Sequence, residues 1–179
     1  MSSFVSRRLQ RTPIKAEEDL DDVAPGSLLE IDQGNYKHWA IYIGDRKVCH
    51  LTVEAVMGGP SFTASLACLK TNKGKILVQL FRDMLAGETP PVFVNNSRDS
   101  KWTPRSAEDI VTSALSYAGQ KVRYDLVTFN CEHFANECRY GIKASLQVED
   151  TADAARVGTV LLGVGAVALA FGKLIFGKR

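Results

Sequence analysis

The 179-residue sequence predicts an α+β fold, because its strand patterns come first along the chain and its helical patterns come later. Two apolar runs, HWAIYIG (38–44) and KVCHLTVEAV (47–56), flank a GDRK turn and are typical of a β-hairpin. Apolar residues then recur at helical spacing between residues 107 and 118, and a second helix is expected over 131–140. The predicted domain therefore combines a sheet with two helices.

This domain is expected to cover residues 23–150 and to begin at the turn Ala24-Pro25-Gly26. SLLEID (27–32) is its first predicted strand, and the hairpin follows. A Gly/Pro-containing loop opens with MGGPSF (57–62). Further strands or extended segments are expected at KILVQLF (75–81), PVFV (91–94) and RYDLV (123–127).

Both helices carry recognisable end signals. Thr103-Pro104 predicts the start of the first helix, since a hydroxyl N-cap and a proline at the first position are typical there. Gly119 is expected to end it. Asn130 is the expected N-cap of the second helix, which Gly141 closes. The apolar face of the first helix comprises Ala107, Ile110, Val111, Ala114, Leu115 and Ala118.

The charge distribution argues against nucleic-acid binding. The formal net charge is +2, but residues 1–16 carry four bases and no acid, and residues 17–22 carry five acids. The middle of the chain, 23–155, holds 14 basic and 15 acidic side chains, whereas a nucleic-acid-binding domain needs a basic face. Residues 1–22 are expected to form a disordered charged arm.

The four cysteines include no CxxC pair, and the N-terminus has no apolar stretch of the kind that a secretion signal needs. We therefore expect a reducing compartment with free thiols. Near the other end, residues 157–172 contain no charge, and with the extension to Phe176 the run spans 20 residues. At ~1.5 Å per residue this is about 30 Å, the thickness of a bilayer core.

The sequence therefore predicts a C-terminal transmembrane helix over 157–176, which would hold the domain at the cytoplasmic face of an intracellular membrane as a single-pass anchor. A buried core helix is the alternative. Ala168 and Gly172 form a small-xxx-small pair, which suggests weak self-association through the span.

The pentad NCEHF (130–134) holds the candidate nucleophile. Cys131 follows the Asn130 N-cap directly, and a helix N-terminus favours the thiolate through its unpaired N–H groups and dipole. His133 is not expected to be its base, because a separation of two residues is a rotation of roughly 200° on a helix. The alternative is that Cys131 belongs to an apolar stripe with Phe134 and Cys138 and only packs.

A base must then come from His38 or His50, which lie on the two strands of the predicted hairpin. A two-residue loop, Asp45-Arg46, puts His50 opposite Ile41 and the histidines on different faces. A loop of odd length, or a bulge, puts His50 opposite Ala40, with His38 as its diagonal neighbour. The group could then act as a Cys–His–His triad, in which one imidazole accepts the thiol proton and the other orients it. Three zinc ligands are the alternative use.

Four blocks in this order, PGSLLEI (25–31), HWAIYIGD (38–45), VCHL (48–51) and NCEHFANECRYG (130–141), resemble the lecithin:retinol acyltransferase-like family. The match is closest to its HRAS-like suppressor branch, the phospholipase A/acyltransferases. The resemblance implies a permuted papain-like (NlpC/P60-like) α+β domain whose antiparallel sheet packs on the nucleophile helix. It also implies that His38 is the base, His50 the polarising histidine and Cys131 the nucleophile that forms an acyl-thioester.

The resemblance further implies a thiol phospholipase A1/A2 and acyltransferase that acts on glycerophospholipids, including N-acylation of phosphatidylethanolamine, with no metal or cofactor. The arm at 1–22 and the region 52–75 depart from the family pattern and concern substrate preference. Two other functions stay open. One is a membrane-anchored interaction protein that regulates membranes or signalling without turnover, and the other is a thiol peptidase or amidase.

Overall fold

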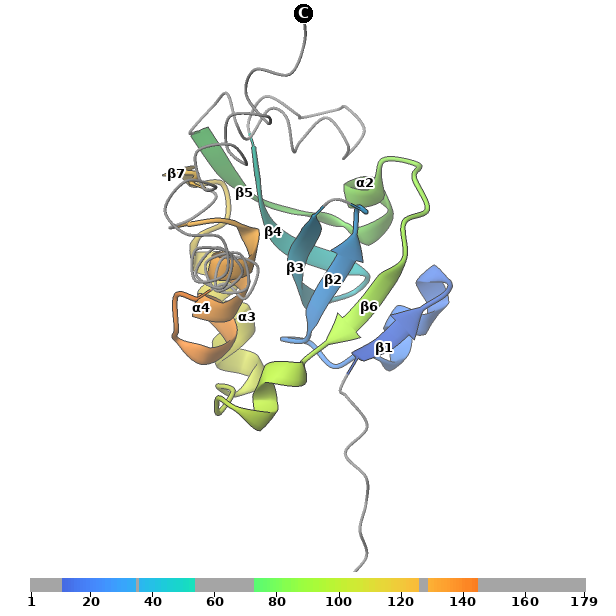
Figure 1. Ribbon diagram of the computed structural model, residues 1–179, viewed down its shortest axis with the longest axis horizontal. Helices are drawn as coiled ribbons and strands as arrows, with labels where there is room; N and C mark the ends of the chain where they lie inside the picture. Colours follow the sequence, from blue (N-terminus) through green and yellow to red (C-terminus); the bar gives the residue numbers. More distant parts are fainter. Residues whose placement is uncertain (1–10, 35, 54–72, 126–128, 145–179) are drawn as a thin grey trace, which may run out of the picture. The chain divides into compact units, whose positions relative to one another are not determined.

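The computed structural model describes residues 11–34, 36–53, 73–125 and 129–144 (Figure 1). The chain divides into two compact units, 1–144 and 145–179, and all described residues belong to the first. This first unit is an α+β domain, as the sequence predicts.

The described residues form a seven-stranded sheet in the order β1-β6-β2-β3-β4-β5-β7, with every neighbouring pair antiparallel. The expected antiparallel sheet is thus confirmed. Strand bounds are β1 Arg11–Ile14, β2 Leu28–Asp32, β3 Lys37–Gly44, β4 Lys47–Val53, β5 Lys73–Leu80, β6 Val92–Asn95 and β7 Lys121–Arg123.

Two longer helices, α3 (Ala107–Ser116) and α4 (Cys131–Tyr140), lie side by side next to the sheet, and α4 contacts β3 and β4 (Figure 1). The shorter helical elements are α2 (Phe81–Leu85) and the 3₁₀ helices η1 (Glu17–Asp22) and η3 (Ser97–Ser100). The histidine-bearing strands β3 and β4 precede the cysteine-bearing helix α4 in the chain. This order is compatible with the expected permuted arrangement.

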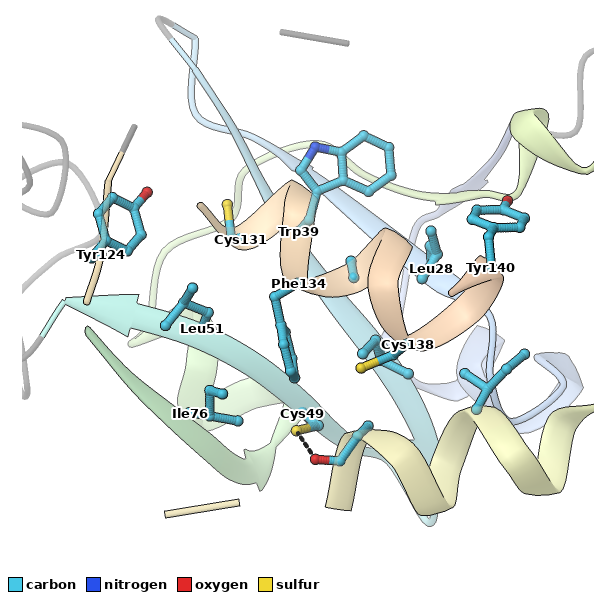
Figure 2. Packing of buried hydrophobic residues seen from close by; sticks show 14 of the residues in the cluster. Leu28, Trp39, Cys49, Leu51, Ile76, Tyr124, Cys131, Phe134, Cys138 and Tyr140 are labelled. Atoms are coloured by element: carbon cyan, nitrogen blue, oxygen red, sulfur yellow. Dashed lines mark hydrogen bonds between the residues drawn. The ribbon is translucent and has the colours of Figure 1, made fainter. Parts of the chain in front are cut away.

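Side chains alternate along the strands and so supply two apolar clusters, one on each face of the sheet. The cluster toward α3 and α4 includes Trp39, Cys49, Leu51, Phe134 and Cys138. Figure 2 shows Phe134 and Cys138 pointing from α4 into this cluster, while Cys131 lies at the beginning of the helix. The cluster on the other face is formed by Leu20, Leu29, Ile31, Ala40, Tyr42, Val48, Phe81, Met84 and Val92.

The first long helix begins three residues later than the Thr103 cap predicts. Its N-cap is Ser106, whose Oγ accepts a hydrogen bond from the Asp109 N–H at 3.1 Å and donates one to the Asp109 carboxylate at 2.7 Å. These two hydrogen bonds give an N–H group of the first turn its acceptor and hold the Asp109 carboxylate at the cap. Ser106 with Asp109 is therefore a stronger start signal than Thr103-Pro104.

Residues 11–22, which the sequence assigns to a disordered arm, belong to the fold. β1 pairs with β6, and Arg11 forms an ion pair of 2.9 Å with the fully buried Glu30. Leu20 of η1 is also fully buried. Charge alone predicted a solvated segment, but its charges have partners on the sheet and its leucine adds apolar burial. Residues 1–10 lie outside the described part of the chain.

The predicted transmembrane helix is not supported, and the fold class is corrected accordingly. Within residues 11–34, 36–53, 73–125 and 129–144, no helix is long and apolar enough to cross a membrane. α3 and α4 have ten residues each and rise about 15 Å, half of a bilayer core. The stretch 157–176 lies outside the described residues. We therefore drop the single-pass anchor and, with it, the assignment to the cytoplasmic face of a membrane.

Candidate active site

The β3–β4 hairpin contains a tight turn with a bulge beside it. Asp45 and Arg46 have positive φ angles of 51° and 54°, the signature of a two-residue type I′ turn. The strand pairing then shifts by one residue between Tyr42 and Gly44, as in a β-bulge. The hairpin therefore has the two-residue turn, Asp45-Arg46. The bulge adds one residue to β3 and so shifts the pairing in the same way as a three-residue loop would.

This bulge brings the two histidines together. His50 pairs with Ala40 rather than with Ile41. His38 lies two residues before Ala40, so it shares the face of His50 and is its diagonal neighbour. His38 Nε2 lies 2.9 Å from His50 Nδ1, and the rings are nearly perpendicular with centroids 5.1 Å apart. The register that the sequence analysis required for a histidine pair is confirmed.

Desolvation keeps both rings neutral. It is the main reason that the pKa of His38 falls to about 3, and the charge of the His50 ring lowers this pKa further. Burial likewise lowers the pKa of His50 to about 4, and His50 is only 5% exposed. Imidazoles with such pKa values are unprotonated at neutral pH.

These shifts predict an acid-sensitive fold. The unfolded chain protonates its histidines near pH 6.5, whereas folded His38 and His50 stay neutral down to about pH 4. Stability is therefore complete above pH 6.5 and falls as the pH is lowered through this window, by up to about 1.4 kcal/mol per pH unit for each histidine. Urea unfolding at several pH values measures this slope. The His50→Gln variant should show a slope shallower by one proton, and an unchanged slope would contradict the assignment.

The helix that carries Cys131 starts and ends where the sequence predicts. Asn130 Oδ1 accepts hydrogen bonds from the backbone N–H groups of Glu132, at 2.9 Å, and His133, at 3.1 Å. Gly141 closes the helix with φ of 73°, a left-handed conformation that favours glycine. Cys131 is consequently fixed as the first residue of the helix, with its own N–H at the positive end of the dipole.

His133 has a structural role that the sequence analysis did not identify. It is buried, and its Nδ1 accepts a hydrogen bond from the Asn130 N–H at 3.3 Å, which completes a reciprocal capping box. Its position three residues after the cap was the available signal, although glutamate or glutamine is usual there. His133 is therefore a buried residue whose Nδ1 caps its own helix, and the argument against it as the base of the thiol stays a prediction.

Removing the Asn130 cap should weaken this helix start. We expect Asn130→Ala to lower the free energy of unfolding by about 1 kcal/mol, because two backbone N–H groups lose their acceptor. Asn130→Asp should retain most of the stability, since a carboxylate oxygen can accept the same bonds. Equilibrium urea denaturation compares the three proteins. Equal losses in both variants would mean that capping is not what Asn130 contributes.

The thiol of Cys131 lies at the beginning of β3. Its Sγ is 3.8 Å from the carbonyl oxygen of Lys37, the residue directly before His38. Trp39 faces α4, so the His38 side chain leaves the strand on the opposite side. In the described part of the chain, the rings of His38 and His50 hydrogen-bond to each other and not to the thiol. The structure thus pairs the histidines directly and brings the cysteine to the backbone beside them.

The other described cysteines are core residues. Cys49 and Cys138 are fully buried, and desolvation is the main reason that the pKa of each thiol rises to about 12. The Cys49 thiol donates a hydrogen bond to the carbonyl of Ala114 at 3.4 Å (Figure 2). Both thiols therefore stay protonated. Across the described ranges, no group of three or more histidine, cysteine and acidic side chains is gathered as for a metal ion, so the zinc alternative gains no support.

Three further polar groups near these residues were not identified from the sequence. Glu132, directly after the cysteine, is buried in an ion pair with Arg98 of η3, and the Arg98 guanidinium lies 4.9 Å from the Trp102 ring. Trp39 Nε1 is buried, and no acceptor for it exists among the described residues. Arg98 and Glu132 are 34 residues apart in sequence, so no local pattern indicates their ion pair.

A cysteine at a capped helix N-terminus, close to a histidine pair, is the arrangement of a thiol-dependent enzyme that works through a covalent intermediate. Comparison with known proteins identifies the family. The family model described as lecithin retinol acyltransferase matches residues 21–144, most of the described domain. The chain belongs to this family.

Its relatives carry a common name. Human phospholipase A and acyltransferase 3 is 36% identical over 155 residues, which cover 87% of this chain and 91% of that protein. Human phospholipase A and acyltransferase 4 is 38% identical over 137 residues, covering 76% and 82%. Human phospholipase A and acyltransferase 2 is 36% identical over 142 residues, covering 79% and 86%. These matches confirm the branch that the sequence blocks suggested.

Proposed function

We propose that this chain is a thiol phospholipase A and acyltransferase that acts on glycerophospholipids through an acyl-thioester on Cys131. Family membership and the shared name of the relatives support the reaction class. The observation that carries the assignment of residues is the 2.9 Å contact between His38 and His50, beside the strand end that the Cys131 thiol touches.

The first half-reaction forms the thioester. His38, neutral at physiological pH, accepts the proton of the Cys131 thiol, and the thiolate attacks the carbonyl carbon of an sn-1 or sn-2 ester. A C–S bond forms and the ester C–O bond breaks. The imidazolium returns its proton to the leaving oxygen, and a lysophospholipid departs. The backbone N–H of Cys131, at the first helical position, is the first candidate donor to the oxyanion.

The second half-reaction cleaves the acyl-thioester. If water attacks, with His38 as the base, the product is a fatty acid and the activity is phospholipase A1 or A2. If the amine of phosphatidylethanolamine attacks, the product is an N-acyl phosphatidylethanolamine and the activity is acyl transfer. In both cases the C–S bond breaks and the thiol is regenerated.

The geometry sets one requirement on this mechanism. Proton transfer requires the His38 ring to lie within hydrogen-bond distance of the Cys131 sulfur. Because the two side chains lie on different faces of β3, they must meet at the strand's first residues, where the thiol already contacts the Lys37 carbonyl. Such hydrogen bonds are often long in unliganded enzymes and tighten when substrate binds. A lipid ester at the thiol is therefore expected to draw His38 and Cys131 together.

Mass spectrometry of the intact chain tests the proposal. After brief incubation with phosphatidylcholine that carries an isotope-labelled acyl chain, the Cys131 peptide should gain the mass of that acyl group, and hydroxylamine should remove it. Cys138→Ala, which lacks a core thiol, should be acylated equally. Absence of any adduct on Cys131 in folded protein, or an adduct on another residue with Cys131 unmodified, would refute the proposal.

A further inference from the structure

One buried atom of the histidine pair lacks a partner. His50 is 5% exposed, and no hydrogen-bond partner for its Nε2 exists among the described residues. Its other ring nitrogen, Nδ1, contacts His38 Nε2 at 2.9 Å. A buried ring nitrogen without a hydrogen-bond partner costs stability, so a nearby side chain that can pair with His50 Nε2 is expected.

The single proton between the two rings decides which of them can act as a base. If His50 Nδ1–H donates to His38, then neutral His38 carries its proton on Nδ1 and the nitrogen left for the thiol cannot accept. If His38 Nε2–H donates to His50 Nδ1, then His38 Nδ1 is an acceptor. In this second arrangement neutral His50 must carry its own proton on Nε2, the atom without a partner.

Gln79 is placed to accept that proton. On β5, Leu77 pairs directly with His50, so Gln79, two residues further, is on the same face and is a diagonal neighbour. His38 on β3 is the diagonal neighbour on the opposite side, because β3 and β5 both run antiparallel to β4. The ring of His50 therefore lies between His38 and Gln79, with one ring nitrogen available to each.

We propose that the side-chain oxygen of Gln79 accepts a hydrogen bond from His50 Nε2–H and so fixes the tautomer in which His38 Nδ1 can act as the base. Gln79 is then a positioning residue of the proposed Cys131 reaction, on which this inference rests. Gln79 is half-buried, and the strand register places it as a diagonal neighbour of His50, within reach of a side chain of this length.

The electrostatics agree with this assignment. Burial has the larger effect on His50 and lowers its pKa, while the Gln79 side chain opposes it and raises the pKa. An amide oxygen that faces the ring N–H would act in this direction, because it stabilises the protonated imidazole.

Nitrogen-15 NMR of the histidine rings in the full chain tests the proposal without any turnover. In the native sequence, His50 should be protonated on Nε2 and His38 on Nε2. Gln79→Leu should shift both rings toward a mixture of tautomers, and Gln79→Glu, which keeps an acceptor, should not. A native His50 protonated on Nδ1, or a Gln79→Leu spectrum identical to the native one, would overturn the proposal. If Gln79→Leu does not fold, the native and Gln79→Glu spectra decide.

Kinetics supply the second readout. Gln79→Leu should lower kcat by on the order of tenfold to a hundredfold with little change in KM, as expected for loss of a residue that orients a functional histidine. Gln79→Glu should retain kcat but move the acidic limb of the pH profile upward, because a carboxylate raises the pKa of His50. Gln120→Leu is the matched control, since the exposed side-chain amide of Gln120 donates its hydrogen bond to the Ser116 carbonyl at the end of α3.

A KM effect alone would overturn the positioning role. If the native chain forms no thioester at all, the proposed function fails, while the tautomer measurement still reports on Gln79.

Discussion

Cys131→Ala is expected to eliminate the acyl-thioester and to lower phospholipid cleavage and acyl transfer together, by roughly three to six orders of magnitude. Among the described residues no other thiol can take the role of the Cys131 sulfur, because Cys49 and Cys138 are fully buried and held protonated. Loss of a covalent nucleophile typically has an effect of this size, and residual activity comes from substrate binding alone. Initial rates on mixed micelles of phosphatidylcholine and detergent measure the loss.

Two controls separate chemistry from folding. Cys131 packs at the edge of the α4 cluster, so its alanine variant should stay folded and lose only about 1 kcal/mol of stability. Cys49→Ala removes a more deeply placed thiol and its hydrogen bond to Ala114, and should be less stable yet active. A Cys131→Ala protein that still transfers acyl chains at the native rate would exclude the thioester and leave a role in binding.

Glu132→Leu is expected to cost about 3–5 kcal/mol of unfolding free energy, the largest stability effect that we expect of a single residue. Glu132 is 1% exposed and Arg98 is 8% exposed, so the substitution leaves a guanidinium charge in the interior without its carboxylate. Removing one member of a buried ion pair costs this much because the remaining charge stays desolvated. Urea denaturation followed by tryptophan fluorescence and circular dichroism provides the measurement.

The double substitution Arg98→Met with Glu132→Leu tests the cause. Two apolar side chains of similar volume leave no buried charge, so the pair should recover much of the lost stability. Lys143→Met, which removes the partner of Glu137 in a pair of 3.3 Å whose lysine is well exposed, should cost less than about 1 kcal/mol. A double variant as unstable as Glu132→Leu would show that the carboxylate matters for another contact and not for the charge balance.

The NCEHF pentad indicates how far local sequence can predict a site. Asn130 as the cap, Cys131 as the first helical residue and Gly141 as the end were all read from residue types, because capping depends on groups within three or four positions of each other. The same local reasoning failed for Ser106, where two capping signals compete within four residues. It also failed for residues 11–22, whose order depends on contacts with β2 and β6.

The transmembrane prediction failed for another reason. Hydropathy identifies an apolar stretch but does not establish that the stretch is a helix, and the described part of the chain contains no helix able to cross a bilayer. The enzyme class did not depend on this segment, since the family match covers residues 21–144.

Residue types along the chain were enough to predict most of the strands other than β1, the helix that carries Cys131 with its cap, and the three residues worth testing, because periodicity, capping and residue chemistry are local properties. Only the tertiary structure decided whether His38 and His50 meet. That outcome depends on one extra residue in a bulge, which moves every later side chain of the strand to the other face. The same holds for Gln79, which is 29 positions from His50 in sequence, and for Arg98, which is 34 positions from Glu132, since strand register and helix packing bring each to the site.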